Sequence, residues 1–199
     1  MSLWLTGIGV SRGIAIDRVQ KMHAGDLDVP EYRLEARDIK AEIERFNEAH
    51  ARARATLREI RDQIPAGTPG DIAAFIDTHL LMMDDRSITE ATISTIRSQH
   101  INAEAALRKT RDALVAVFEQ MEDPYLKTRK DDVEHVVARI LRALLKSEKP
   151  LAAKAESEAE PAIIVADDIT PADIILLAQQ NVRAFVTEYG GPLSHTAIL

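Results

Sequence analysis

Residues 34–64 read LEARDIKAEIERFNEAHARARATLREIRDQI, and this stretch decides the fold of the chain. Its apolar or seam positions recur at alternating spacings of four and three: Ile39, Ile43, Phe46, His50, Ala53, Leu57, Ile60 and Ile64. This period is typical of a long helix that packs in a bundle or an antiparallel coil. His50 lies on the seam, so we expect it to pack in the interior rather than to bind a ligand.

Four further amphipathic segments follow, and each opens with a capping or proline signal. Their predicted starts are Thr68-Pro69, Ser87 with Glu90 as a capping box, Asn102, and Asp123-Pro124. Short polar turns separate these segments, which is typical of a helical bundle. We predict a helical subdomain over residues 33–147.

The flanking regions have the pattern of strands rather than of bundle helices. Short apolar runs at residues 14–16 followed by Val19, at 162–166 and at 182–187 predict strands, and Thr170-Pro171 predicts a helix between the last two. A β-α-β order implies parallel strands. We therefore predict an α+β protein, in which the bundle is inserted into a partial α/β domain formed by residues 1–32 and 148–199.

Composition narrows the class of protein. The 199 residues carry a formal charge of −7 and no cysteine, which argues against a nucleic-acid surface and excludes disulfides and thiolate metal sites. The acidic excess suits small-molecule or basic protein partners, and it equally suits simple solubility. No apolar run approaches the ~20 residues of a membrane span. We expect a cytoplasmic protein without membrane insertion and without a metal site.

His195 is the main candidate for chemistry. It follows the paired Gly190-Gly191 that lets the backbone turn sharply, and Ser194 before it suits a helix N-cap. A helix start offers unpaired N–H groups to a phosphoryl group, and a neutral imidazole is a nucleophile at neutral pH. The sequence thus predicts a phosphoryl carrier at a strand-to-helix junction.

The motif Gly-Gly-x-x-Ser-His-Thr-Ala-Ile resembles the phosphohistidine signature of the phosphoenolpyruvate-utilising enzymes. Thr196 makes it most similar to Enzyme I of the bacterial sugar phosphotransferase system, since related dikinases usually carry alanine there. Further segments resemble Enzyme I in the same order along the chain: residues 11–16, 75–85, 125–133 and 168–171. The resemblance covers essentially the whole chain.

The resemblance implies a mechanism and a role for several residues. In this family phosphoenolpyruvate phosphorylates the histidine, and a swivelling phosphohistidine domain passes the group to the carrier HPr, which docks on the helical subdomain. His195 is then the carrier, Thr170 hydrogen-bonds its ring, Arg129 is a cation near the transferring group, and His79 lies at the docking edge. Capping for Thr170, a structural role for Arg129 and packing for His79 are the alternatives.

The resemblance also implies what these 199 residues lack. The swivel domain is expected to be incomplete after Leu199, and the barrel that binds phosphoenolpyruvate and Mg²⁺ lies outside the chain, so no cofactor is expected here. We expect a monomer, with a homodimer for the full-length family member. A helical HPr-docking module without catalytic competence, the nitrogen branch of Enzyme I, or another phosphoenolpyruvate-utilising enzyme are the alternatives.

Overall fold

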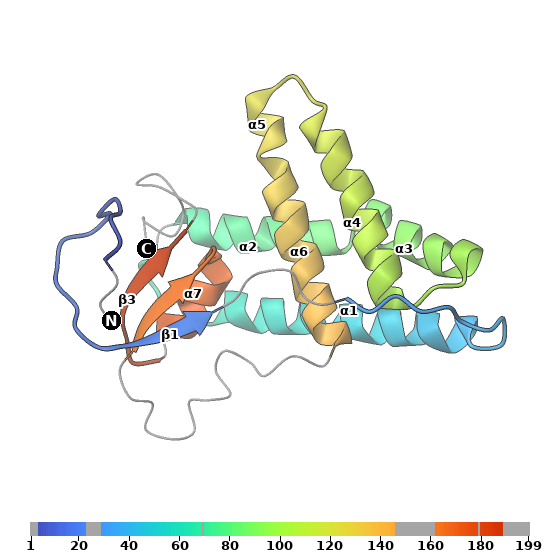
Figure 1. Ribbon diagram of the computed structural model, residues 1–199, viewed down its shortest axis with the longest axis horizontal. Helices are drawn as coiled ribbons and strands as arrows, with labels where there is room; N and C mark the ends of the chain where they lie inside the picture. The colour runs from blue at the N-terminus through green and yellow to red at the C-terminus, as the bar shows by residue number, and fades with distance from the viewer. Residues whose placement is uncertain (1–3, 23–28, 69, 146–161, 179, 189–199) are drawn as a thin grey trace. The chain divides into compact units, whose positions relative to one another are not determined.

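Two units make up the chain in the computed structural model (Figure 1), and each is described by itself. The structure describes residues 4–22, 29–68, 70–145, 162–178 and 180–188. One unit spans Asp26–Lys149, and the other combines Met1–Gly25 with Pro150–Leu199. The first unit is helical and the second holds a sheet, so the expected combination of a bundle with an α/β part is confirmed.

The helical unit is built from one long helix and several shorter ones. Its elements are α1 (Ile39–Asp62), α2 (Gly70–Met83), α3 (Arg86–Gln99), α4 (Ala103–Glu119), the short α5 (Pro124–Lys127) and α6 (Arg129–Leu144). Helix α6 packs against α1 and α4, and α2 packs against α1. Their facing side chains form an aliphatic core that is closed to solvent.

The buried face of α1 differs from the predicted seam by a small rotation. Phe46, Ala53, Leu57 and Ile60 are buried as predicted, whereas Ile43 and His50 are only half-buried and their places are taken by Glu42 and Ala49. Glu42 is buried because its carboxylate binds Arg45 and the backbone N–H of Ala103, at 2.7 and 2.6 Å. His50 packs at the edge of the core, where its Nε2 lies 2.8 Å from the carbonyl oxygen of Met83.

Two of the predicted helix caps use other groups than expected. Asp85, not Ser87, caps α3, because its carboxylate accepts a hydrogen bond from the Ser87 N–H at 2.7 Å. Glu90 pairs with Arg86 instead of completing a capping box. Asn102 does occupy the N-cap of α4, but its side chain makes no cap hydrogen bond and instead binds backbone groups of Pro30 and Tyr32.

The second unit is a parallel three-stranded sheet with one helix. Strands β1 (Arg18–Met22), β2 (Ala162–Ala166) and β3 (Val182–Thr187) pair in the order β1-β2-β3, and α7 (Pro171–Ala178) connects β2 to β3. The parallel arrangement is confirmed. Strand β1 includes Val19 as predicted but begins later than predicted. Ile14 and Ile16 precede it and are more than 90% exposed. Met22, rather than these isoleucines, packs against the core of the sheet.

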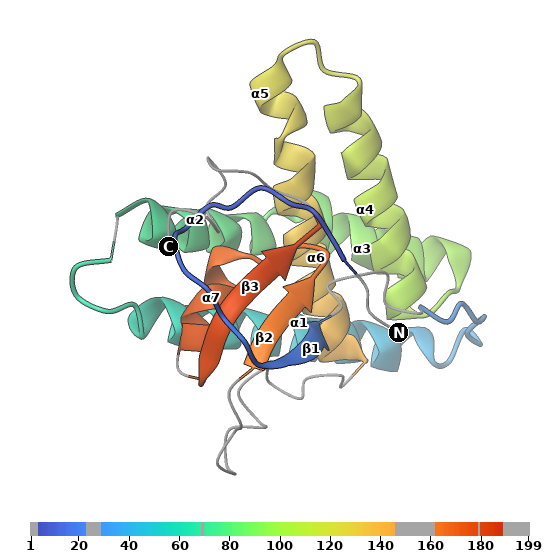
Figure 2. The same cartoon turned by 60° about the vertical axis from the view of Figure 1, so that its left-hand side comes forward.

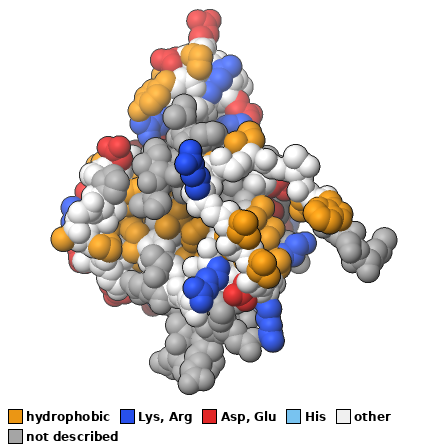
Figure 3. All heavy atoms as spheres, turned by 90° about the vertical axis from the view of Figure 1, so that its left-hand side faces the viewer, with side chains coloured by type: hydrophobic (Ala, Val, Ile, Leu, Met, Phe, Trp, Pro, Cys, Tyr) orange, Lys and Arg blue, Asp and Glu red, His pale blue; other side chains and the backbone are white. Residues whose placement is uncertain are grey.

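Helix α7 covers one face of this sheet (Figure 2). Ile164 and Ala166 of β2 pack against Ile169, Ile174 and Leu177, because alternate residues of a strand point to one face. Figure 3 shows the face that is on the left-hand side in Figure 1, and hydrophobic side chains lie at the surface there.

Over the described residues, no helix has the length and apolar character to cross a membrane.

Candidate functional site

The predicted phosphoryl-carrying loop follows β3 in the sequence. His195, Gly190, Gly191, Ser194 and Thr196 lie outside the described residues. The structure does describe the place from which this segment departs. Thr187 at the end of β3 pairs with Ala166 at the end of β2, and the Glu188 N–H donates to the Ala166 carbonyl at 3.0 Å. The residues after β3 therefore start at the carboxyl ends of the parallel strands. The turn from β2 to Thr170 begins at the same ends.

Thr170 occupies the N-cap of α7 in a reciprocal arrangement with Asp173. The Thr170 hydroxyl donates to the Asp173 carboxylate at 2.6 Å, and the Asp173 N–H points back to the hydroxyl at 3.3 Å. The same carboxylate oxygen accepts the Thr170 N–H at 3.1 Å. This is a capping box with aspartate in place of glutamate. The capping role of Thr170 is thus observed.

Arg129 opens α6 beside an aromatic ring and a carboxylate. Its Nη1 donates to Oδ2 of Asp132 at 2.8 Å, its Nη2 binds the Tyr125 hydroxyl, and its guanidinium carbon lies 4.8 Å from the Tyr125 ring centroid. The hydrogen bond to Asp132 raises the pKa of Arg129. These contacts hold a permanent cation at the start of the helix, where it remains partly exposed.

His79 reaches the same carboxylate from α2. Its Nε2 lies 3.2 Å from Oδ1 of Asp132, and its ring packs 4.1 Å from the Phe75 ring. Burial lowers the pKa of His79, although Asp132 acts in the opposite direction. Burial acts to raise the pKa of Asp132, but the hydrogen bonds from His79 and Arg129 outweigh it and lower that pKa. At neutral pH the pair is therefore a neutral imidazole beside a carboxylate.

The structure thus joins two predicted site residues through a third that was not predicted. Asp132 connects His79 and Arg129, which lie on different helices. Because His79 is only 2% exposed, its burial favours the packing alternative over direct contact with a partner. Thr170 belongs to the other unit.

Exposed hydrophobic residues of the helical unit are a second feature that the sequence analysis missed. Leu81 lies off the buried face of α2, so it breaks the amphipathic pattern and could have indicated such a surface. Four such side chains are exposed: Leu81, Val117, Tyr125 and Leu126. Exposed apolar groups of this size on helices are typical of a docking surface when they lie together.

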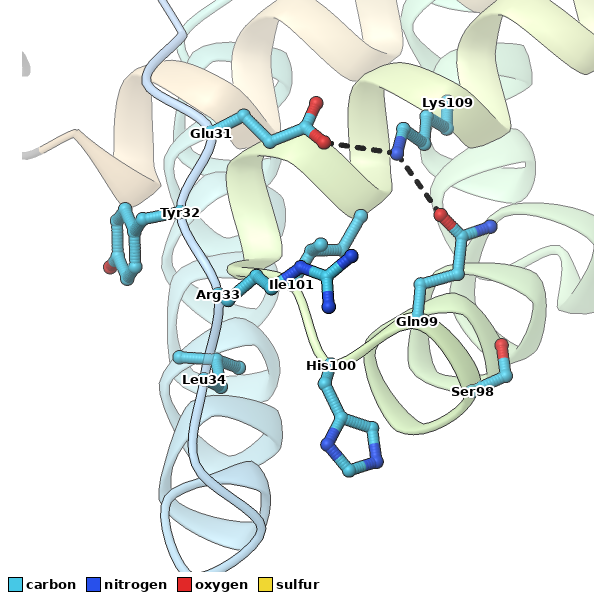
Figure 4. A pocket seen from close by; sticks show the side chains of 9 residues that line it. All are labelled: Glu31, Tyr32, Arg33, Leu34, Ser98, Gln99, His100, Ile101 and Lys109. Atoms are coloured by element: carbon cyan, nitrogen blue, oxygen red, sulfur yellow. Dashed lines mark hydrogen bonds and ion pairs between the residues drawn. The ribbon is translucent and has the colours of Figure 1, made fainter.

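A hollow between the segment before α1 and the turn from α3 to α4 contains none of the predicted site residues (Figure 4). Among its lining residues, Lys109 is bound by Glu31 at 3.2 Å and by Gln99 at 3.0 Å. The lysine charge is therefore already neutralised by a neighbouring carboxylate. We attribute no chemistry to this hollow.

Comparisons with known proteins agree with these features. The family description "PEP-utilising enzyme, N-terminal" matches residues 6–129, and "PEP-utilising enzyme, mobile domain" matches residues 158–199. The chain belongs to the PEP-utilising enzymes. The second match includes the segment of His195.

Within the PEP-utilising enzymes, the chain matches the amino-terminal region of phosphoenolpyruvate-protein phosphotransferases. It is 37% identical over 205 residues to that of Cupriavidus necator and 35% identical over 195 residues to that of Bacillus subtilis. These matches cover 100% and 98% of this chain. The chain spans about a third of each relative, 35% and 33% of their lengths.

Solved structures of PEP-utilising enzymes show the same fold. A solution structure of Enzyme I superposes with a TM-score of 0.69 at 25% identity, over 87% of this chain and 69% of that one. The amino-terminal domain of a nitrogen Enzyme 1 superposes with a TM-score of 0.67 at 23% identity, over 95% and 76%. The predicted relationship to the amino-terminal region of Enzyme I is confirmed.

Proposed function

We propose that this chain carries a phosphoryl group on His195 and exchanges it with the carrier protein HPr. The observation that carries the proposal is the mobile-domain match over residues 158–199, which spans the Gly-Gly-x-x-Ser-His-Thr motif. In the exchange a P–N bond to the histidine of phosphorylated HPr breaks and a P–N bond to His195 forms. Such a transfer depends on alignment and charge neutralisation more than on acid–base chemistry.

Thr170 has a defined part in this proposal. Its hydroxyl hydrogen is held by Asp173, so a hydrogen bond between Thr170 and the His195 ring would need the ring as donor and the threonine oxygen as acceptor. An N–H on one ring nitrogen of His195 would bind there, and the other nitrogen would then carry its lone pair toward phosphorus. The segments of Thr170 and His195 both follow the carboxyl ends of neighbouring strands, β2 and β3, which supports this pairing.

The helical unit is the proposed docking site for HPr. Its exposed hydrophobic residues, such as Tyr125, supply apolar contact area, and Arg129 supplies a cation next to it. A partly exposed guanidinium suits the stabilisation of a transferring phosphoryl group. In this proposal His79 has no direct contact with HPr and acts by positioning Asp132 and Arg129.

In this proposal, the reaction with phosphoenolpyruvate takes place on another part of a full-length Enzyme I. Phosphoenolpyruvate and Mg²⁺ would bind to a barrel domain outside these 199 residues, and the transfer between His195 and HPr would need no cofactor from this chain. We propose a monomer for these residues and a cytoplasmic location, where HPr and sugar phosphorylation are found in this family.

The test is transfer of ³²P from phosphorylated HPr to the chain. We expect an acid-labile, base-stable label that is absent from His195→Ala, and a slower transfer to Arg129→Ala than to Arg129→Lys. A label that persists in His195→Ala would remove this histidine from the mechanism. Binding of HPr in calorimetry without any label would instead support the docking module that lacks catalytic competence.

A further inference from the structure

A group of three metal-ligand side chains lies between α2 and α6. His79 comes from α2, and Asp132 and His135 come from α6, where a spacing of three residues places them on one face. One ligand atom from each residue lies within 4.8 Å of the other two. The group is shielded from solvent, since His79 and Asp132 are buried and His135 is half-buried.

The distances are close to those that a transition metal needs. The 3.2 Å between His79 Nε2 and Asp132 Oδ1 compares with about 3.3 Å between two ligands of tetrahedral zinc, given bond lengths of about 2.0 to 2.1 Å. Bringing His135 to the same separation needs a movement of about 1.5 Å, which side-chain rotation on a helix can supply.

The neighbouring arginines and the types of ligand affect which metal ion could bind to this group. Arg129 binds Oδ2 of Asp132 and so leaves Oδ1 directed at the histidines, in the manner of an outer-shell partner that orients a ligand. Arg139 acts electrostatically on His79 and opposes a cation. Two imidazoles and one carboxylate favour zinc or a similar divalent transition metal over Mg²⁺ or Ca²⁺, which prefer oxygen ligands.

We propose that His79, Asp132 and His135 form a binding site for a divalent transition metal of the zinc type, which links α2 to α6. Sites of this kind are built in helical bundles from acidic and histidine side chains spaced by three residues, facing a ligand from another helix. The inference goes beyond the proposed phosphoryl transfer and does not depend on it. The three ligands leave a fourth coordination position open for water or a partner group.

Metal binding to the full chain, freed of any affinity tag, tests the site. After treatment with a chelator, we expect one Zn²⁺ per chain in competition with a chromophoric chelator, and Co²⁺ should give the visible absorption of four-coordinate imidazole ligation. His135→Gln should weaken Zn²⁺ binding by at least about 100-fold, because removing a ligand costs no less than losing an outer-shell partner. An unchanged affinity would overturn the proposal.

His100→Asn is the matched control. His100 is an exposed histidine of the same unit, and its positive φ of 52° is a conformation that asparagine tolerates. Its substitution should leave the Zn²⁺ affinity unchanged, and an equal loss in both variants would indicate nonspecific binding and contradict the site. In the unsubstituted chain, Zn²⁺ should shift the imidazole NMR signals of His79 and His135 before that of His100. The opposite order would also overturn the proposal, whether or not His135→Gln folds.

Discussion

At the scale of single residues, Thr170 combines an observed structural role with a proposed functional one. Thr170→Ala removes the hydroxyl that caps α7, and we expect a loss of about 1 kcal/mol in the free energy of unfolding of the sheet unit. Thr170→Ser keeps the hydroxyl and should retain most of that stability. Urea unfolding checks both variants. Equal losses for alanine and serine would show that the methyl group, and not the cap, stabilises this turn.

His79 predicts a pH dependence of stability. Burial lowers its folded-state pKa below the ordinary 6.5, so between these two values the unfolded chain binds more protons than the folded chain. Stability should therefore fall as the pH is lowered from 7 through 6.5 toward the folded pKa. Asp132 adds a loss in the same direction only below 3.8, because its own pKa is lowered from that value.

The measurement is the free energy of unfolding of the helical unit between pH 7 and pH 5. The decline should be smaller in His79→Gln, which cannot take up the proton, and unchanged in His100→Asn. If the unsubstituted chain and His79→Gln showed the same decline, His79 would not be the group responsible.

At the scale of elements, an ion-pair network joins α1 to α4. Arg45 binds Glu42 at 2.7 Å and Glu104 at 2.6 Å, and both carboxylates are buried. Arg45→Ala would leave two buried carboxylates without their cation, so we expect the free energy of unfolding to fall by about 3 kcal/mol. This is the lower end for a broken buried pair, because the Arg45 side chain is one-third exposed.

An exposed pair supplies the comparison for Arg45. Arg86 binds Glu90 at 2.7 Å with an 81% exposed side chain, and Arg86→Ala should lower the free energy of unfolding far less than Arg45→Ala does, because water and salt screen an exposed pair. Chemical denaturation measures both variants. Similar losses in the two would show that burial of Glu42 and Glu104 does not decide the strength of the network.

At the scale of the whole molecule, the two units have separate cores. Leu57 lies in the core of the helical unit and Ile164 in that of the sheet unit. Truncation of either to alanine should destabilise its own unit by about 2 to 5 kcal/mol. Hydrogen exchange followed by mass spectrometry should show faster exchange in α1 for Leu57→Ala and in β2 for Ile164→Ala. Faster exchange in both units from either variant would contradict the separation of the two cores.

The sequence by itself determined the features that depend on local interactions. Helical period, proline and capping signals placed α2, α4 and α7 within a few residues, and the β-α-β order implied parallel strands. The signal at Asp123-Pro124 opens the short α5 instead of the predicted long helix, which begins as α6 at Arg129. The same holds for the family, since the motif at His195 is a continuous stretch of chain. The roles of His195, Thr170, Arg129 and His79 in phosphoryl transfer stay predictions.

Only the tertiary structure decided which distant side chains meet. His79 and Asp132 are 53 residues apart in the chain, and the first N–H of α4, from Ala103, donates to Glu42 from 61 residues away. The start of β1 was likewise set by pairing with β2, which left Ile14 and Ile16 exposed. A local sequence pattern predicts the hydrogen bonds within one helix or strand. The partner of a buried charge or of a strand depends instead on how elements that are remote in the sequence pack together.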